Sequence, residues 1–365
     1  MIIRRRTLLA ATAAAAVASP ALAQNYPRRA VQLVVAFPAG GSTDVGARIL
    51  AAAAEKDLGQ TITVVNKAGA GGQIGFTEVA RARPDGYTLG FLNLPAVNTI
   101  ILDPERKAAF NVDSFIPIIN QVLDPGLIWV KGDSPYKTLA DLTEAARKNP
   151  GKISACTTGI LSDDHLAILM VQEVAKCEFR IVHFDGGAQQ ITGVLGGHVD
   201  CAFDNVGGVF KRVQSGEVRG LAVTDSERSK FLPQVPCTKE LGMPTIISSS
   251  TRGVGAPKGT PADVVKVIET AFLKAINSPE MLQKMDAVGL ALKPMVGAEY
   301  AKYYADTQAQ AKKYTEWAGG SACNQAREPA PSRIDKDILA AAFTPPPSYD
   351  EGTSPSRAPR RGGGF

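Results

Sequence analysis

Aromatic side chains are scarce in this chain of 365 residues, and its positive charge is not concentrated in the body of the chain. Phe, Trp and Tyr make up 6% of the residues, which argues against the stacking surfaces that bind single-stranded nucleic acids. The formal net charge is +5, but Arg4, Arg5 and Arg6 supply three of these charges and the residues after 318 supply one more. The body is therefore close to neutral, which excludes the basic footprint of a nucleic-acid-binding protein.

Several catalytic and metal-binding signatures are also missing. The sequence contains no GxxxxGKS or GxxxxGKT phosphate loop, no GxSxG elbow, no HExxH and no CxxC. GAGGQIG fits a dinucleotide fingerprint only loosely, because it does not follow the first strand and no acidic residue ends the next one. His165, His183 and His198 lack the close spacing of metal ligands, so we interpret them as helix-end or strand-end residues. We expect no catalytic residue, no metal and no cofactor.

Cysteine is sparse, and its number is odd. The five positions are Cys156, Cys177, Cys201, Cys237 and Cys323. An exported protein can keep disulfides, and an odd count leaves at least one thiol without a partner in the same chain. We expect one or two structural disulfides, with the remaining thiols buried.

The first 23 residues predict a cleavable signal peptide. A basic start is followed by the short apolar run TLLAATAAAAVASP and by ALA, a small-x-small site that places cleavage after Ala23. Both twin-arginine and ordinary secretory export fit this segment. No later segment is long and apolar enough for a membrane helix, so we expect a periplasmic protein that is not inserted in the membrane.

Short β-branched runs alternate with Ala-rich helical stretches between Val31 and Phe210. VQLVVAF predicts a strand, VGARILAAAAEKDLG a helix that ends at Gly59, TITVVN a second strand and YTLGFLNL a third. This order predicts a parallel sheet with helices on its faces. A second alternating series begins at Lys152, so we expect an α/β fold with two such units.

Two segments that lack helical periodicity predict the connections between these units. The apolar stretch at 113–133 indicates extended chain that crosses between two lobes, and TRGVGAP indicates the return crossing. We expect lobe 1 at 24–125 and 250–318, and lobe 2 at 126–249. Residues 319–365 are rich in Pro, Gly, Ser and Arg, which predicts an unstructured tail.

The first strand leads into FPAGGSTDVGAR, where two glycines and two hydroxyl residues precede a helix. Gly40 and Gly41 lack Cβ atoms, so the backbone can turn sharply and approach a ligand. A helix begins with unpaired N–H groups and a partial positive charge, which together favour an anion. We expect Asp44 to brace this loop through hydrogen bonds to its backbone.

Similar loops follow other strands in both units. They are KAGAGGQIG at 67–75, CTTGILSDD at 156–164 and DNVGG at 204–208. In open α/β sheets, ligands bind at the carboxyl ends of the strands. Loops of this kind in two facing lobes predict a ligand held between them.

Together these motifs resemble the substrate-binding proteins of tripartite tricarboxylate transporters, also called the Bug family. The resemblance runs from about Tyr26 to Ala318 and rests on FPAGGSTDVGAR, NKAGAGGQIGFTEVARARPDGYTL, HFDGGAQQITGVLGGHVDCAFDN, GEVRGLAVTDSERSKFLPQVP and GVGAPKGTP. It implies a two-lobed, type II-like periplasmic binding protein of the Venus flytrap kind. Such a receptor closes on a carboxylate-bearing solute and passes it to the permease subunits of a membrane transporter.

The resemblance also implies which residues form the site. With the loop analysis, it predicts ligand contacts from Phe37, Ala39, Gly40, Gly41, Ser42, Asn93, Thr157, Thr158, Gly159, Asp204 and Asn205. Asp44, Gly71 and Gly72 are expected to brace the loops. The implied ligand is a di- or tricarboxylate, an amino acid or an aromatic acid, and the implied receptor is a monomer that binds no nucleic acid.

The chain departs from the family pattern in two segments. CTTGILSDD stands where the family usually has a small-residue pattern, and SSSTRG stands where an aromatic residue is common. Arg252 in the second segment could supply charge to the cleft or lie on the surface, and we favour the surface. Two other functions stay open from the sequence: a nucleotide-dependent α/β enzyme, and a ligand sensor for a membrane signalling partner.

Overall fold

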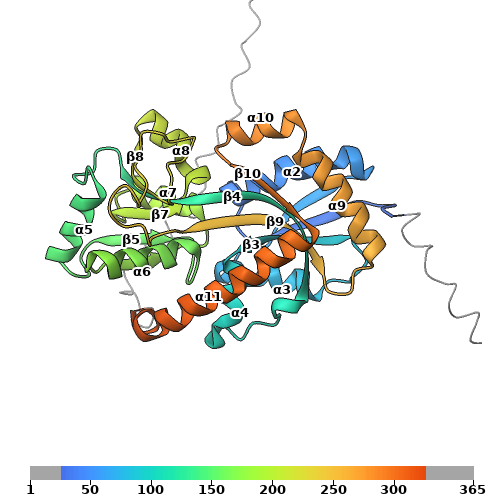
Figure 1. The fold of residues 1–365 in the computed structure, drawn as a ribbon, viewed down its shortest axis with the longest axis horizontal. Coiled ribbons are helices and arrows are strands. Elements are labelled where there is room, and N and C mark those ends of the chain that lie inside the picture. The colour runs from blue at the N-terminus through green and yellow to red at the C-terminus, as the bar shows by residue number, and fades with distance from the viewer. Residues whose placement is uncertain (1–25, 326–365) are drawn as a thin grey trace, which may run out of the picture. The chain divides into compact units, whose positions relative to one another are not determined.

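A computed structural model describes residues 26–325 of the chain. Within these residues the strands form one ten-stranded sheet in the order β2-β1-β3-β9-β4-β7-β5-β6, and both β10 and β8 pair with β4 (Figure 1). The predicted signal peptide lies outside the described residues. We call the part built on β1, β2 and β3 the first lobe, and the part built on β5, β6, β7 and β8 the second lobe.

The first lobe contains the predicted parallel strands and the helices that connect them. Its elements are β1 (Val31–Val35), α2 (Ser42–Leu58), β2 (Ile62–Asn66), a 3-10 turn η2 (Ala70–Gly72), α3 (Gln73–Arg81), β3 (Thr88–Leu94), α4 (Ala96–Leu102), and two 3-10 turns, η3 (Pro104–Arg106) and η4 (Val112–Ser114). β1 pairs in parallel with both β2 and β3, as the sequence predicts.

The second lobe repeats this pattern. Its elements are α5 (Leu139–Lys148), β5 (Ser154–Thr157), α6 (Asp163–Ala175), β6 (Arg180–His183), α7 (Gly187–Leu195), β7 (Cys201–Asn205), α8 (Val206–Ser215) and β8 (Val218–Thr224). β5 pairs in parallel with β6 and β7. The carboxyl ends of β5 and β7 therefore meet at one edge of the sheet, where α6 and α8 begin.

Two long antiparallel strands, β4 (Phe115–Lys131) and β9 (Ser249–Pro257), connect the lobes. From Phe115 to Pro125, β4 pairs with β9, and from Gly126 onward it pairs with β7 and β8 instead. The stretch predicted to be extended is thus a single strand that serves both lobes. These antiparallel strands make the complete sheet mixed.

The chain returns to the first lobe after β9. Its last elements are α9 (Ala262–Ile276), α10 (Pro279–Ala287), β10 (Leu292–Val296) and α11 (Gly297–Gln325). α11 packs against α4 and β4. It continues past Ala318, so the predicted start of the unstructured tail at residue 319 is wrong. The remainder of that predicted tail lies outside the described residues.

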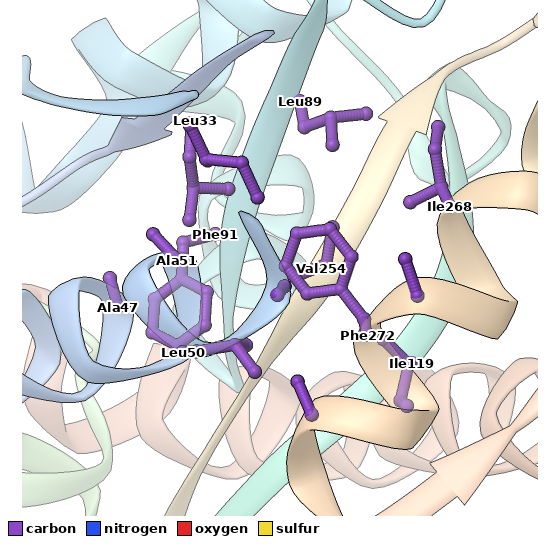
Figure 2. Close-up of a cluster of buried hydrophobic side chains, with 14 of the residues drawn as sticks. Leu33, Ala47, Leu50, Ala51, Leu89, Phe91, Ile119, Val254, Ile268 and Phe272 are labelled. Carbon is purple, nitrogen blue, oxygen red and sulfur yellow. The ribbon is translucent and has the colours of Figure 1, made fainter. Parts of the chain in front are cut away.

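Hydrophobic cores cover both faces of the first-lobe sheet. On one face Leu33 packs in a cluster with side chains of α2 and α9, while Val34 packs on the other with side chains of α3, α4 and α11. Figure 2 shows the first cluster, in which Leu50 and Phe272 lie close to the sheet strands. Strands buried on both faces need nearly continuous apolar sequence, which explains the VQLVVAF run.

The core position of Phe272 gives a test of this packing. Its side chain is fully buried, so Phe272→Ala should lower the free energy of unfolding by about 3–5 kcal/mol through lost burial and a residual cavity. Urea unfolding followed by circular dichroism measures this change. Leu282→Ala is the control, because Leu282 is 49% exposed and should cost about 0.5 kcal/mol or less. Equal losses in the two variants would contradict this account of the core.

Candidate ligand-binding site

The loop between β1 and α2 is held open by one buried carboxylate. Asp44 Oδ2 accepts hydrogen bonds from Gly40 N and from Arg48 Nε, each at 3.0 Å, and Asp44 Oδ1 accepts from Asn66 Nδ2 at 2.9 Å. Asn66 Nδ2 also donates to Phe37 O at 2.9 Å, so the loop is tied at both ends. Burial favours a higher pKa for Asp44, but the hydrogen bonds from Arg48, Gly40 and Asn66 outweigh it and lower the pKa.

The start of α2 remains without a side-chain cap. Gly41 occupies the N-cap position with φ −77° and ψ 166°, and no side chain accepts from the first turn. The first N–H groups of a helix have no acceptor within the helix, and the helix dipole adds a partial positive charge there. Gly40 has φ +84°, a backbone conformation that a side chain would strain. The loop thus presents bare backbone donors at the edge of a cavity.

That cavity lies between the lobes and has a volume of about 60 Å³. Four helices begin at this cavity, and their N-cap residues and first turns line it: Gly41 and Ser42 for α2, Ser162 and Asp163 for α6, Gly186 and Gly187 for α7, and Asn205 and Gly208 for α8. Ala96, the first residue of α4, lies there as well. A convergence of helix N-termini favours a bound anion.

The loop of the second lobe is held by polar side chains behind it. Thr158 N and Thr158 Oγ1 donate to Asp164 Oδ2 at 3.0 and 2.5 Å. Leu161 N donates to His165 Nδ1 at 2.9 Å, and Thr157 Oγ1 lies 2.8 Å from His183 Nδ1. Buried contacts of this kind fix the loop whose Thr158 and Gly159 face the cavity.

The two histidines behind this loop form a pair that sequence spacing did not reveal. Their ring centroids are 4.8 Å apart, with the planes nearly perpendicular. Burial, His183 and Arg106 together lower the pKa of His165 well below its ordinary value, and burial followed by the charge of Arg106 lowers that of His183 to about 4. Both rings are therefore neutral near pH 7, which lets His165 Nδ1 accept from Leu161.

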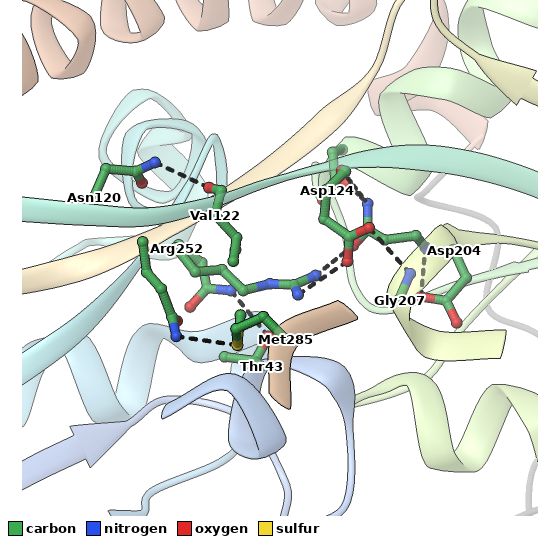
Figure 3. A network of polar contacts seen from close by, with 12 residues as sticks. Thr43, Asn120, Val122, Asp124, Asp204, Gly207, Arg252 and Met285 are labelled. Carbon is green, nitrogen blue, oxygen red and sulfur yellow. Dashed lines mark hydrogen bonds and ion pairs between the residues drawn. The ribbon is translucent and has the colours of Figure 1, made fainter. Parts of the chain in front are cut away.

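A buried polar network joins β4, β9 and the second lobe (Figure 3). Arg252 Nη1 lies 3.0 Å from Asp124 Oδ2, and Arg252 Nη2 donates to Asn205 Oδ1 at 2.9 Å. Asn205 Nδ2 donates to Asp163 Oδ2 at 2.7 Å, and Asn205 N donates to Asp204 Oδ1 at the same distance. Arg252, Asp204, Asn205 and Asp163 also line the cavity.

The prediction that Arg252 lies on the surface is wrong. Its exposed fraction is 1%, because Asp124 and Asn205 provide the charge and the acceptor that an interior guanidinium requires. Burial is also the main reason that the pKa of Asp204 rises to about 7 and that of Asp124 to about 6. The network therefore contains carboxylates that bind a proton far more readily than exposed ones.

The structure brings most of the predicted site residues to the cavity. Those that line it are Phe37, Gly40, Gly41, Ser42, Asn93, Thr158, Gly159, Asp204 and Asn205, together with Gly71. Ala39, Thr157, Asp44 and Gly72 do not line it. Sequence reasoning did not select Asp163 and favoured a surface position for Arg252, because the roles of both depend on partners from other elements.

The expected disulfides are absent among four of the five cysteines. Cys156, Cys177, Cys201 and Cys237 are free thiols, so the prediction of one or two bridges is wrong for these positions. Cys156, Cys201 and Cys237 are buried and pack as small apolar side chains. Among residues 26–325, none of the helices combines the length and hydrophobicity that a membrane span requires.

Comparison with known proteins agrees with this architecture. The family model described as a tripartite tricarboxylate transporter family receptor matches residues 46–319. Protein BugT of Bordetella pertussis (strain Tohama I) is 32% identical over 278 residues, which cover 76% of this chain and 85% of BugT.

Two solved structures share the fold over most of their length. The periplasmic binding protein BugD is 31% identical, with a TM-score of 0.75 over 80% of this chain and 99% of that one. The R. palustris protein Rpa4515, solved with adipate, is 28% identical, with a TM-score of 0.76 over 80% of this chain and 98% of its own. The predicted fold class, a two-lobed α/β periplasmic binding protein, is confirmed.

The neutral state of His183 predicts a pH-dependent stability. Its folded pKa of about 4 lies below the ordinary 6.5, so the unfolded chain binds more protons between these values. The neutral ring therefore contributes up to roughly 3 kcal/mol to the free energy of unfolding. This contribution is present above pH 6.5 and is lost as the pH falls to about 4.

Unfolding measured from pH 8 to pH 4 in wild type and in His183→Phe tests this. The stability of the wild type relative to the variant should decrease on acidification through this window. Buried Asp124 and Asp204 have raised pKa values and therefore act in the opposite direction, but both are common to the two proteins and cancel in the difference. A constant difference across the window would contradict the prediction.

Proposed function

We propose that this chain, which belongs to the tripartite tricarboxylate transporter family of receptors, is a binding protein that captures a small carboxylate between its two lobes. One observation carries the proposal: α2, α6, α7 and α8 all begin at a single interlobe cavity. The N–H groups at the start of α2, which no side chain caps, and the dipole of this helix stabilise a bound carboxylate without a lysine or arginine in the first loop. The adipate in the related R. palustris protein is a ligand of this chemical class.

We assign the ligand's carboxylate to the first-lobe loop. The start of α2 offers donors from Gly41, Ser42 and Thr43, of which Gly41 lacks any side chain. Thr158 and Gly159 face the same cavity from the second lobe. A solute that contacts both loops can make all of its contacts only when the lobes are close. It therefore binds the closed state more tightly than the open state and shifts the equilibrium between them toward closure.

In this proposal Arg106 acts as a clasp, by which we mean a side chain that holds the two lobes together through hydrogen bonds to both. Its Nη1 donates to Ala70 O of the first lobe at 2.7 Å, and its Nη2 donates to Ile160 O of the second lobe at 3.0 Å. A Cβ built on Gly159 would lie 3.2 Å from Gly71 Cα, so the two glycine loops approach with almost no space between them. We propose that residues 126–249 move against the remainder, with the hinge where β4 changes partners after Pro125.

The remaining parts of the proposal concern location and partners. The basic, apolar and small-residue segments of the first 23 residues support export to the periplasm and removal of this leader. The family match supports delivery of the solute to the permease subunits of a tripartite transporter. We infer a monomeric receptor that binds its ligand without catalysis.

Substitution of Gly41 tests the carboxylate seat. The backbone of Gly41 already has N-cap geometry, and a Cβ there would meet only Pro38 O at 3.9 Å. Gly41→Asp should preserve or raise stability, since Asp is a favoured N-cap, yet its negative charge should weaken carboxylate binding by about a hundredfold or more. Thermal-shift screening of carboxylates finds a ligand, and isothermal titration calorimetry then measures the affinity.

Gly41→Asn is the matched variant. Its side chain has the same shape and also caps the helix, but it carries no charge, so it should weaken binding less than Gly41→Asp. Wild-type affinity in a folded Gly41→Asp protein would contradict the proposed seat. Absence of any stabilising carboxylate in the wild-type screen would contradict the function itself.

Arg106→Gln tests the clasp. Loss of the charge-assisted bond to Ile160 O should raise the ligand dissociation rate about tenfold or more, measured by stopped-flow fluorescence. Lys230→Met is the control, because the Lys230–Asp286 pair at 2.7 Å also joins the lobes but is exposed, and exposed pairs contribute little. Equal dissociation rates in wild type and Arg106→Gln would exclude Arg106 as the clasp.

A further inference from the structure

The two sides of the cavity differ in electrical character. The first-lobe side presents the backbone donors of α2, whose acidic residue Asp44 is engaged by Arg48, Asn66 and Gly40. The second-lobe side presents two carboxylates, Asp163 and Asp204, which are 7% and 4% exposed. A ligand that fills the space between them therefore meets donors at one end and acceptors at the other.

The only cationic side chain that lines the cavity among the described residues is already engaged. Arg252 forms a buried ion pair with Asp124 at 3.0 Å and a hydrogen bond with Asn205. Its single positive charge is thus balanced by Asp124, which does not line the cavity. Asp163 and Asp204 are attracted by the charge of Arg252, but neither forms an ion pair with it.

Among residues 26–325, hydrogen bonding leaves two acceptors of the cavity lining without partners, against one donor, Arg252 Nε. Asp163 Oδ2 accepts from Asn205 Nδ2, and Asp204 Oδ1 accepts from Asn205 N. Within the described residues, Asp204 Oδ2 and Asn93 Oδ1 are buried and have no hydrogen-bond partner. Both residues line the cavity, and buried acceptors without a donor are costly enough that a native structure rarely leaves them so. The missing donors are those that a ligand would supply.

The helix N-termini on the second-lobe side do not favour a second anion. Asp163 stands in the first turn of α6, where it offsets the positive end of that helix. Asp204 Oδ2 lies close to Gly187 and Gly208, in the first turns of α7 and α8: Cβ atoms built there would come within 3.4 and 2.6 Å of it. The protein's own carboxylates therefore occupy the positive ends of these three helices.

We propose that the ligand is a small amino acid in its zwitterionic form. Its carboxylate binds the start of α2, and its ammonium group lies between Asp163 and Asp204. The identification rests on the proposed function, because it uses the same cavity and the same carboxylate seat. The cavity of about 60 Å³ has space for roughly four to six water molecules, which suits a molecule of a few carbon atoms.

Ligand pairs of equal chain length test the proposal most directly. In each pair an amino acid and a dicarboxylate share one carboxylate and differ at the other end: 4-aminobutanoate against succinate, and β-alanine against malonate. Glycine and alanine, with butanoate as the uncharged-end control, complete the panel. Calorimetry on the mature wild-type chain at pH 7 should show at least tenfold tighter binding of an amino acid than of its dicarboxylate and of butanoate.

Proton exchange on binding gives a second readout on the same protein. The pKa of Asp204, raised to about 7 chiefly by burial, should fall when an ammonium group arrives beside it. Binding at pH 7 should then release a fraction of a proton, measured by titration in phosphate and in Tris, whose ionisation enthalpies differ. Proton uptake on binding would indicate an added negative charge instead and would overturn the proposal.

Asp163→Asn removes one of the two charges while keeping an oxygen that can accept from Asn205. It should weaken the amino acid at least tenfold and reduce the preference over the dicarboxylate. Asp133→Asn is the control, because the Asp133 side chain is 73% exposed and does not line the cavity, so the affinities should not change. If Asp163→Asn does not fold, the wild-type panel still decides the matter.

The possible outcomes separate this inference from the proposed function. Tighter binding of the dicarboxylate would mean that the N–H groups of Arg252 outweigh Asp163 and Asp204, which would overturn the amino-acid assignment and leave carboxylate capture intact. Equal binding of butanoate and 4-aminobutanoate would show that the ammonium group contributes nothing. That result would also overturn the amino-acid assignment and leave carboxylate capture intact. Binding of neither class would reject the carboxylate function, and with it the inference.

Discussion

The site depends on backbone N–H groups that the fold leaves without partners. The proposed carboxylate seat at the start of α2 requires that no side chain caps the helix and that the loop stays open without a ligand. Gly41 at the N-cap has no side chain that could cap the helix. Asp44 keeps the loop open by accepting hydrogen bonds from Gly40 N and Arg48 Nε. The carboxylate of Asp44 is therefore already paired with groups of the protein, and its negative charge is partly neutralised by Arg48, so that it repels a bound anion less.

Two strands shared by both lobes determine where the remaining groups lie. β4 and β9 pair along the first lobe, and β4 then continues between β7 and β8 of the second. The loops at the carboxyl ends of strands in each lobe therefore face one cavity. The same strands contribute Asp124 and Arg252, so the buried ion pair lies where the lobes are connected. Any relative movement of the lobes changes the surroundings of these two charges.

Charge balance gives the cavity its polarity. One guanidinium is compensated by one carboxylate, and the two carboxylates that remain lie beside the starts of α6, α7 and α8. Burial raises the pKa of Asp204 to about 7, because a low-dielectric surrounding disfavours its charged form. In the proposed receptor, such a site distinguishes ligands by the end that faces the second lobe, while all of them place a carboxylate at the start of α2.

The sequence by itself determined the α/β architecture, the open loop before α2 and the candidate loops of both lobes, because hydrophobic periodicity and glycine placement are local properties of the chain. Only the tertiary structure decided the roles of Arg252, Asp163 and the His165–His183 pair. Arg252 meets Asp124 across two strands, and Asn205 connects it to Asp163 at the start of α6. Burial and charge compensation depend on partners far apart in the chain, and no local pattern specifies them.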